Sequence, residues 1–232
     1  MAEIVCFGDS NTFGFNPRNG KRYDENTRWS GILKQKLKDK FSVIEAGCNN
    51  RTCYSINPDS DELTGFKALT KYLKPTTNYL ILAVGLNDLQ KFYSSTDKEI
   101  KEGITNLINI ARKIAPEIEI IILAPSRIKK NILNSYFSAL FNEEAIEKSM
   151  TDDNINQVEE TDNHINKIKV NHKNLNSSKS KIEDNNLNKS KKTKQIVVSK
   201  YKTLTSDELI DLLDSTDNVE EFFDNIEVGN DK

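Results

Sequence analysis

Apolar residues gather along the chain in two kinds of pattern. Short and nearly continuous apolar runs recur at 4–7, 41–46, 79–84 and 118–124. The third run reads Tyr-Leu-Ile-Leu-Ala-Val, and the fourth reads Ile-Glu-Ile-Ile-Ile-Leu-Ala. Runs of this length and composition are typical of strands that are covered on both faces, as in parallel sheets. The pattern therefore predicts four buried strands.

Between these runs, apolar residues recur at helical spacing, with polar residues between them. Three such stripes predict helices, formed by Trp29, Ile32, Leu33 and Leu37, by Leu63, Phe66, Leu69, Tyr72 and Leu73, and by Ile100, Ile104, Leu107, Ile108, Ala111 and Ile114. Strands that alternate with helices favour an α/β fold. We expect a flavodoxin-like, doubly wound parallel sheet in three α/β/α layers.

The patterning divides the chain into three parts. Residues 1–149 predict the α/β core. Residues 150–198 are rich in Asn, Lys, Ser and Asp and contain no aromatic residue. Such a segment cannot bury enough apolar surface to offset its ordering entropy, so it predicts a disordered polar insertion. Its lysines, densest at 189–194, indicate a solvated charge run rather than a contact for an anionic partner.

Residues 199–232 form an acidic segment in which an apolar pattern returns. Thr205 and Glu208 fit a capping box, which predicts a helix that begins at residue 206. A short strand at 209–213 is the competing interpretation of the same residues.

Composition excludes several classes of function. The net charge is −2 over 232 residues, so there is no general electrostatic attraction for nucleic acid. The three cysteines lack metal-ligand spacing, and Cys6 within an apolar run is expected to be a buried hydrophobe. No apolar run is long enough to span a bilayer. We expect a cytoplasmic protein without disulfides and without a membrane partner.

Three predicted strands are followed by short segments of small and polar residues. These segments are Gly8-Asp9-Ser10-Asn11, the stretch 45–52, and Val84-Gly85-Leu86-Asn87-Asp88. In a doubly wound sheet, ligands bind outside the carboxyl ends of the strands, near the point where the strand order reverses. The three segments are therefore expected to meet at one pocket.

This pocket would suit nucleophilic chemistry. Ser10 lies at the tip of a Gly-flanked turn and would supply the nucleophile. The backbone N–H groups of Ser10 and Gly47, together with the Asn87 side chain, would donate hydrogen bonds to an oxyanion. Each residue also has a plainer interpretation when taken alone: Gly47 as a turn residue, Asn87-Asp88 as a cap, and Arg51 as a surface cation. Their order, each after a predicted strand, favours a site.

The same segments resemble the SGNH, or GDSL-type, hydrolases, and specifically their arylesterase-like branch. The resemblance covers roughly residues 3–149 and rests on the three segments above, with further likeness at Arg28-Trp29, Arg51-Thr52, Ala124-Pro125 and 141–149. It implies that Ser10 is the nucleophile and that Ser10, Gly47 and Asn87 form the oxyanion hole. It also implies hydrolysis of esters, often of acetyl or other short acyl groups, without a metal or an organic cofactor.

The general base of this family is a His three residues after an Asp on a C-terminal loop, and this chain departs from that pattern. Its two histidines, His164 and His172, lie in the polar insertion, and neither has an Asp three residues before it. If the family pattern resumes at 200–202, then Leu212-Leu213-Asp214-Ser215 resembles the last strand and the loop that leaves it. Asp224 then keeps the family Asp, and Glu227 stands at the position of the His. An acidic helix over these residues is the plainer interpretation.

A Glu in place of His changes the expected chemistry. An exposed Glu has a pKa near 4.3, against about 6.5 for His, so it accepts a proton from serine poorly. Loss of general-base assistance typically costs roughly 10²–10⁴-fold in rate. The sequence therefore leaves three readings: a serine esterase of full or reduced activity that acts on a small-molecule ester, an inactive relative that binds a ligand or serves as a scaffold, and a chain whose C-terminal part is degraded.

Two loops are expected to border the pocket, at 16–27 and 91–93. Their aromatic residues, Tyr23, Phe92 and Tyr93, either pack on an apolar substrate or pack on the protein itself. The oligomeric state does not follow from these patterns.

Overall fold

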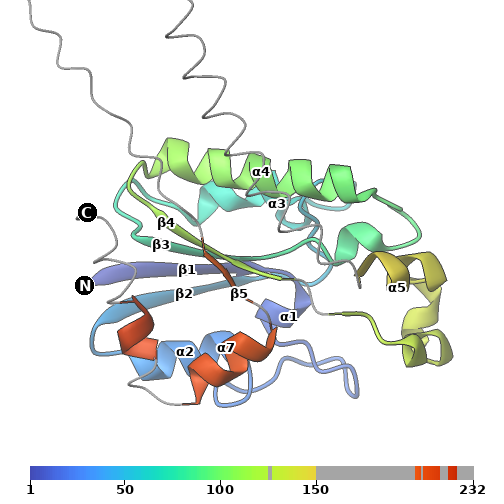
Figure 1. Ribbon diagram of the computed structural model, residues 1–232, viewed down its shortest axis with the longest axis horizontal. Coiled ribbons are helices and arrows are strands. Elements are labelled where there is room, and N and C mark those ends of the chain that lie inside the picture. Colours follow the sequence, from blue (N-terminus) through green and yellow to red (C-terminus); the bar gives the residue numbers. More distant parts are fainter. Residues whose placement is uncertain (125–126, 150–201, 205, 215–218, 224–232) are drawn as a thin grey trace, which may run out of the picture.

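The computed structural model describes residues 1–124, 127–149, 202–204, 206–214 and 219–223. Five parallel strands form one twisted sheet in the order β2-β1-β3-β4-β5 (Figure 1). Their bounds are β1 (Ala2–Gly8), β2 (Phe41–Gly47), β3 (Tyr79–Ala83), β4 (Glu119–Leu123) and β5 (Lys202–Leu204). This is the flavodoxin-like strand order, in which the direction of winding reverses between β1 and β3.

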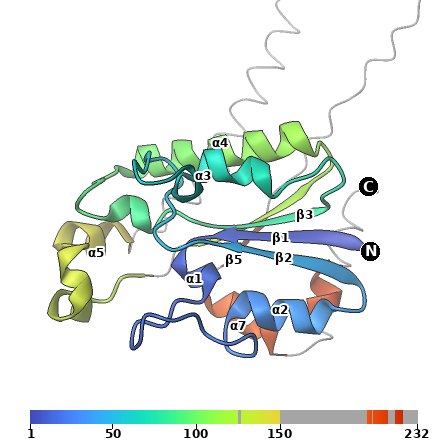
Figure 2. The ribbon, with the colours of Figure 1, turned by 180° about the vertical axis from the view of Figure 1, so that it is seen from behind.

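Helices cover both faces of the sheet and make three layers. One face is covered by α3 (Gly65–Ala68) and α4 (Asp97–Ile114), and the other by α2 (Trp29–Leu37) and α7 (Ser206–Leu213) (Figures 1 and 2). Two further helices, α1 (Ser10–Phe13) and α5 (Glu143–Ser149), lie toward the carboxyl ends of the strands. Each face therefore has its own apolar core, and the predicted three-layer fold is confirmed.

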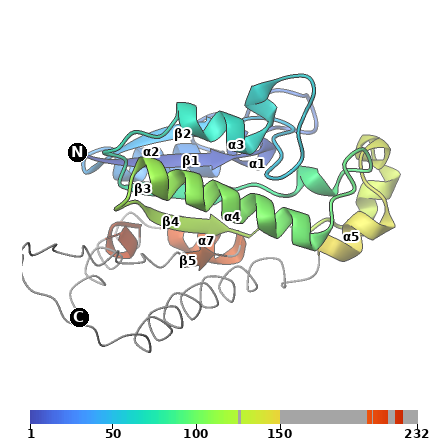
Figure 3. The same ribbon diagram turned by 90° about the horizontal axis from the view of Figure 1, so that it is seen from above.

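The helix α4 shows why the sequence pattern was informative. Thr96 accepts a hydrogen bond from the Glu99 N–H, while the Glu99 carboxylate accepts one from the Thr96 N–H, which makes a complete capping box. From this cap the helix runs along the strands (Figure 3). Its predicted apolar stripe is buried against the sheet, at Ile100, Ile104, Leu107, Ile108 and Ala111.

The helix expected over 63–73 is interrupted in the structure. It consists of two 3₁₀ turns, η1 (Asp61–Leu63) and η2 (Leu69–Lys71), on either side of α3. Thr52 causes the interruption, because it forms backbone hydrogen bonds with Leu63 and Gly65 at 2.9 Å each. A Cβ atom on Gly65 would lie 2.5 Å from the Thr52 carbonyl oxygen, so this approach requires glycine.

The C-terminal part corrects one expectation. The last described strand is β5 at 202–204, paired with β4, whereas Leu212 and Leu213 end the helix α7. The placement of the last strand at Leu212-Leu213 is therefore wrong, and the competing strand at 209–213 is wrong as well. The helix predicted from residue 206 is confirmed, because Leu209, Leu212 and Leu213 recur at helical spacing and pack on the core.

The apolar residues at 219–223 cover the edge of the sheet at which the strands begin. The Phe223 ring lies 5.3 Å from that of Phe41 and 5.0 Å from that of Tyr79, which are the first residues of β2 and β3. A Lys40–Glu220 ion pair of 2.8 Å lies beside them. Residues 219–223 therefore pack at the amino ends of the strands. The expected polar insertion at 150–198 lies outside the described residues.

Candidate active site

Ser10 begins the helix α1 directly after the end of β1. The Asp9 side chain caps this helix by accepting a hydrogen bond from the Asn11 N–H at 2.9 Å, and the Asp9 N–H donates to the Ala83 carbonyl of β3 at 3.1 Å. A Cβ on Gly8 would lie 1.9 Å from the Thr12 Oγ1 atom, so only glycine permits this tight turn. The half-buried Ser10 is held at the reversal point of the sheet, beside the neighbouring strand.

Gly47 and Asn87 end or follow the two strands that flank β1. Gly47 pairs with Gly8 in the register of β2 and β1, and a Cβ on it would lie 2.2 Å from the Phe13 backbone nitrogen. Asn87 lies in the 3₁₀ turn η3 (Asn87–Leu89) after β3 and is 5% exposed. The structure therefore brings Ser10, Gly47 and Asn87 to the carboxyl ends of three adjacent strands, as the sequence predicted.

Asp88 was considered above as a helix cap, but its carboxylate bonds to a different part of the chain. It does not cap η3, because its carboxylate accepts hydrogen bonds of 2.8–3.0 Å from the N–H groups of Cys53, Tyr54 and Ser55. Burial raises the pKa of Asp88, and these three hydrogen bonds oppose that rise. Asp88 therefore ties the end of β3 to the loop that follows Arg51 and Thr52.

Arg51 is buried, and its interpretation as a surface cation is wrong. Its side chain is fully inaccessible and donates hydrogen bonds to the carbonyl oxygens of Gly8 and Ala46 and to both the carbonyl and the carboxylate of Glu62. Its own carbonyl accepts a hydrogen bond of 3.0 Å from the Asn87 side chain. Arg51-Thr52 contributed to the family resemblance in the sequence, but Arg51 was assigned no role in the site, although its place just after a strand end was a usable signal.

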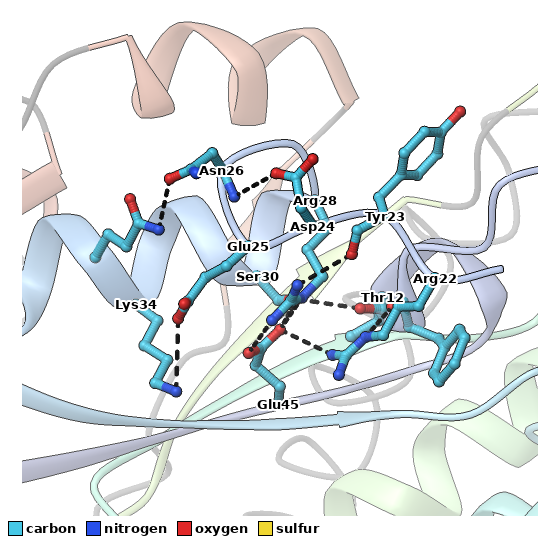
Figure 4. A network of polar contacts seen from close by, with 12 residues as sticks. Thr12, Arg22, Tyr23, Asp24, Glu25, Asn26, Arg28, Ser30, Lys34 and Glu45 are labelled. Carbon is cyan, nitrogen blue, oxygen red and sulfur yellow. Dashed lines mark hydrogen bonds and ion pairs between the residues drawn. The ribbon is translucent and has the colours of Figure 1, made fainter.

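A second arginine cluster lies between β2 and the loop that joins α1 to α2 (Figure 4). Arg28 forms a two-pronged ion pair with Glu45 of β2, with N–O distances of 2.6 and 2.9 Å. Arg22 and Ser30 donate further hydrogen bonds to the same carboxylate, at 3.0 and 2.8 Å. The hydrogen bond from Arg28 and those beside it lower the pKa of Glu45 to about 2. The cluster fastens the loop between α1 and α2 to the sheet.

That loop forms one wall of a cavity of about 330 Å³. The other walls are the carboxyl ends of β1, β3 and β4 and the helix α7. The lining residues are Asp9, Asn11, Gly14, Phe15, Tyr23, Thr27, Arg28, Trp29, Ala83, Val84, Leu123, Ala124, Leu209 and Ile210. Asp9 and Asn11, the two chain neighbours of Ser10, line the cavity, whereas Ser10, Gly47 and Asn87 are not among its lining residues. Burial raises the pKa of Asp9 to about 7.

Tyr23, Phe92 and Tyr93, which were expected either to contact an apolar substrate or to pack on the protein, differ in their surroundings. Tyr23 lines the cavity, as one interpretation predicted. Phe92 and Tyr93 do not line it. Their rings pack on each other with centroids 5.0 Å apart, and the Tyr93 hydroxyl accepts a hydrogen bond from Asn57 at 2.6 Å. Another aromatic contact lies nearer the cavity, between Phe15 and Phe137 at 6.5 Å.

The general base remains a prediction. Asp224, Glu227, His164 and His172 all lie outside the described residues. Near the site, β5 ends at Leu204 and α7 begins at Ser206. Within the described ranges, no group of three or more His, Cys, Asp or Glu residues could hold a metal ion.

Comparison with known proteins agrees with this architecture. Residues 6–159 match the GDSL-like lipase/acylhydrolase family, which is well over half of the chain. The chain therefore belongs to this family of SGNH hydrolases. A comparison with curated proteins found no match. No helix in the described part of the chain is long and apolar enough to cross a membrane.

Solved structures of similar proteins include esterases of the arylesterase-like branch. A carbohydrate acetylesterase family member from Sinorhizobium meliloti is 27% identical, with a TM-score of 0.58 over 64% of this chain and 73% of that one. The native M. smegmatis aryl esterase is 26% identical, with a TM-score of 0.55 over 64% and 74% of the two chains. A putative arylesterase from Agrobacterium tumefaciens is 24% identical, with a TM-score of 0.56 over 65% and 74%.

Proposed function

We propose that this protein is a serine esterase that removes short acyl groups, acetyl among them, from small-molecule esters through an acyl-enzyme on Ser10. The observation that carries the proposal is the meeting of Ser10, Gly47 and Asn87 at the carboxyl ends of β1, β2 and β3. Two of the similar structures are described as an acetylesterase family member and an aryl esterase, which supports the choice of substrate class.

The reaction proceeds in two balanced steps. In the first, the Ser10 Oγ attacks the carbonyl carbon and gives its proton to a base, and the departing alcohol takes up a proton as the ester C–O bond breaks. In the second, water attacks the acyl-enzyme, releases the acid and restores the hydroxyl. The oxygen that becomes negative in each step would accept hydrogen bonds from the Ser10 and Gly47 N–H groups and the Asn87 side chain.

Two features of this chain support these roles for Gly47 and Asn87. The Asn87 side-chain nitrogen carries two hydrogens, and the structure uses one of them on the Arg51 carbonyl at 3.0 Å. Its oxygen accepts a hydrogen bond from Gln90 at 2.8 Å, which fixes the side chain with the nitrogen on the side of Arg51. Gly47 has no Cβ, which allows α1, the helix that begins at Ser10, to pack directly against it.

The proposal is tested with the full-length chain and p-nitrophenyl acetate. We expect a burst of p-nitrophenol and labelling by a fluorophosphonate probe, and we expect Ser10→Ala to abolish both. Equal rates for the wild-type protein and Ser10→Ala would overturn the proposal.

The second candidate is an inactive relative that binds the same class of ligand. The observation that favours it is the connection between β5 and α7, which is a single residue long. The family carries the Asp and His of its general base on a C-terminal loop, and this connection is too short to hold both. The same experiment separates the candidates. A chain that binds short-chain esters without releasing alcohol, and whose Ser10 does not react with the probe, supports the second.

A further inference from the structure

Arg51 is a charged residue whose burial calls for an explanation. Its side chain is 0% exposed, and its guanidinium lies 4.2 Å from the centre of the Phe7 ring. A buried charge is costly unless every donor is paired, and an apolar residue often fills such a place at lower cost. The contacts of the guanidinium therefore indicate what this arginine does that an apolar residue would not.

The guanidinium joins the strands that carry Ser10 and Gly47. One of its terminal nitrogens, Nη1, donates both to the Gly8 carbonyl, at 3.1 Å, and to the Ala46 carbonyl. Gly8 precedes Ser10 by two residues, and Ala46 immediately precedes Gly47. The Gly8 carbonyl also accepts a hydrogen bond of 3.1 Å from Cys48, on the other side of Gly47.

The main chain of the same residue holds the third member of the site. The Arg51 carbonyl accepts the hydrogen bond from the Asn87 side chain at 3.0 Å, and Arg51 N–H donates to Cys48 at 3.3 Å. Arg51 therefore contacts the segments that carry all three residues of the proposed oxyanion hole.

A further set of residues fixes the guanidinium itself. Its Nε donates to the Glu62 carbonyl at 2.9 Å, and its Nη2 pairs with the Glu62 carboxylate. The carboxylate also accepts hydrogen bonds from the Tyr72 hydroxyl and from Lys71. The planar fork of arginine is held from several sides, a geometry that the single ammonium group of lysine cannot reproduce.

We propose that Arg51 is a positioning residue that sets the separation between Gly47 and Asn87 around Ser10. This inference rests on the proposed esterase function, since it assigns Arg51 to the same site. A displacement of about 1 Å at a reacting centre can cost up to about 100-fold in rate. Loss of the fork would let the strand ends and Asn87 shift, so the effect falls on kcat rather than on KM.

The test compares Arg51→Lys with the wild-type full-length protein, using p-nitrophenyl acetate. We expect kcat to fall about tenfold to 100-fold, with KM changed less than twofold, and the rate of fluorophosphonate labelling to fall in parallel. Glu62→Gln keeps the arginine and weakens only its support, so it should lose less activity than Arg51→Lys. An unchanged kcat in Arg51→Lys would overturn the inference.

A matched control separates positioning from general loss of stability. Leu37 is fully buried at the end of α2, on the other face of the sheet. Leu37→Ala should lower the unfolding midpoint at least as much as Arg51→Lys while leaving kcat unchanged. If both variants lose kcat in proportion to their stability, Arg51 is merely structural and the inference fails.

The failure of the esterase proposal can be told apart from the failure of this one. If the wild-type chain neither hydrolyses esters nor reacts with the probe, the esterase proposal fails. Positioning is then measured in crystal structures of the wild-type protein and Arg51→Lys. A changed distance between Gly47 and the Asn87 side chain supports the inference, and an unchanged distance overturns it.

Discussion

The two arginine clusters at the carboxyl ends of the strands differ in what they hold. Arg51 is fully buried and bonds mainly to backbone carbonyls, so it connects strand ends to one another. Arg28 keeps about a tenth of its side chain exposed and bonds mainly to one carboxylate, Glu45, so it connects a loop to a strand. The first cluster lies behind the proposed oxyanion hole, and the second supports the cavity wall.

On the proposed esterase function, this difference assigns an effect on rate to the first cluster and an effect on substrate binding to the second. Substitutions around Arg51 should change kcat, because they move the groups that we propose contact the transition state. On the same proposal, substitutions around Arg28 should change KM and stability, because they loosen a cavity wall that would contact the substrate equally in the ground state and the transition state. The following predictions challenge that division, beginning with the largest expected effect.

Asp9 belongs to both regions. It lines the cavity beside Arg28, and the charges of Asp88 and Arg51 contribute to its pKa. Burial raises its pKa from 3.8 to about 7, so the folded chain holds a proton that the unfolded chain releases between these two values. Stability should therefore decrease as the pH rises from about 4 through 7, and Asp9→Asn should remove the decrease. Asn also caps helices well.

The size of this effect follows from the shift in pKa. The gain in unfolding free energy of Asp9→Asn over wild type should be larger at pH 8 than at pH 4, by as much as about 4 kcal/mol. Urea unfolding at the two pH values measures it. A gain that does not depend on pH would show that Asp9 is ionised in the folded chain at both values.

Glu45 tests the second region alone. Its pKa is lowered from 4.5 to about 2, so the stabilisation by its charge is complete above about pH 4.5 and is lost as the pH falls toward 2. Glu45→Gln should cost about 2 kcal/mol at pH 7, and little at pH 2.

Kinetics of the same variant bear directly on the comparison between the clusters. Glu45→Gln should raise KM for p-nitrophenyl acetate several-fold and leave kcat within about twofold of wild type, since only the loop wall is loosened. Ser42→Ala, a change at an exposed position of the same strand, serves as the control and should alter neither constant. If kcat falls as much in Glu45→Gln as in Arg51→Lys, the proposed difference between the two arginine clusters is wrong.

The sequence supported the fold and the three site segments for a physical reason. Ser10, Gly47 and Asn87 each lie within three residues of the end of a nearly continuous apolar run, and parallel strands bring such ends together. Arg51 was assigned no role because a long charged side chain between polar residues resembles a surface residue, and only tertiary contacts reveal its burial. The three-residue strand β5 carries too few apolar residues to be recognised, and the last strand was expected at Leu212-Leu213 instead.

The interrupted helix at 61–71 shows a second case in which contacts distant in sequence decide what the local pattern cannot predict. The apolar spacing there is helical, and Leu69 is buried as expected. The backbone is nevertheless diverted at Thr64 and Gly65 by contacts with Thr52, which is distant in sequence. Local periodicity identifies which residues face the core, whereas the continuity of a helix also depends on such distant partners.

Tyr23 offers the smallest effect and the most direct view of the cavity wall. Its carbonyl accepts a hydrogen bond from Arg28 at 3.1 Å, while its side chain lines the cavity. Tyr23→Ala keeps the carbonyl and removes only the ring, so the loop stays fastened. Loss of one aromatic contact is worth about 1 kcal/mol, which corresponds to a KM raised about fivefold at constant kcat.

Steady-state kinetics with acetate esters of small and bulky alcohols would measure this change in KM, with Phe92→Ala, at an exposed position, as the matched aromatic control. If Phe92→Ala raises KM and Tyr23→Ala does not, substrate binds on the side of Tyr93, and the cavity beside Arg28 is not the binding site.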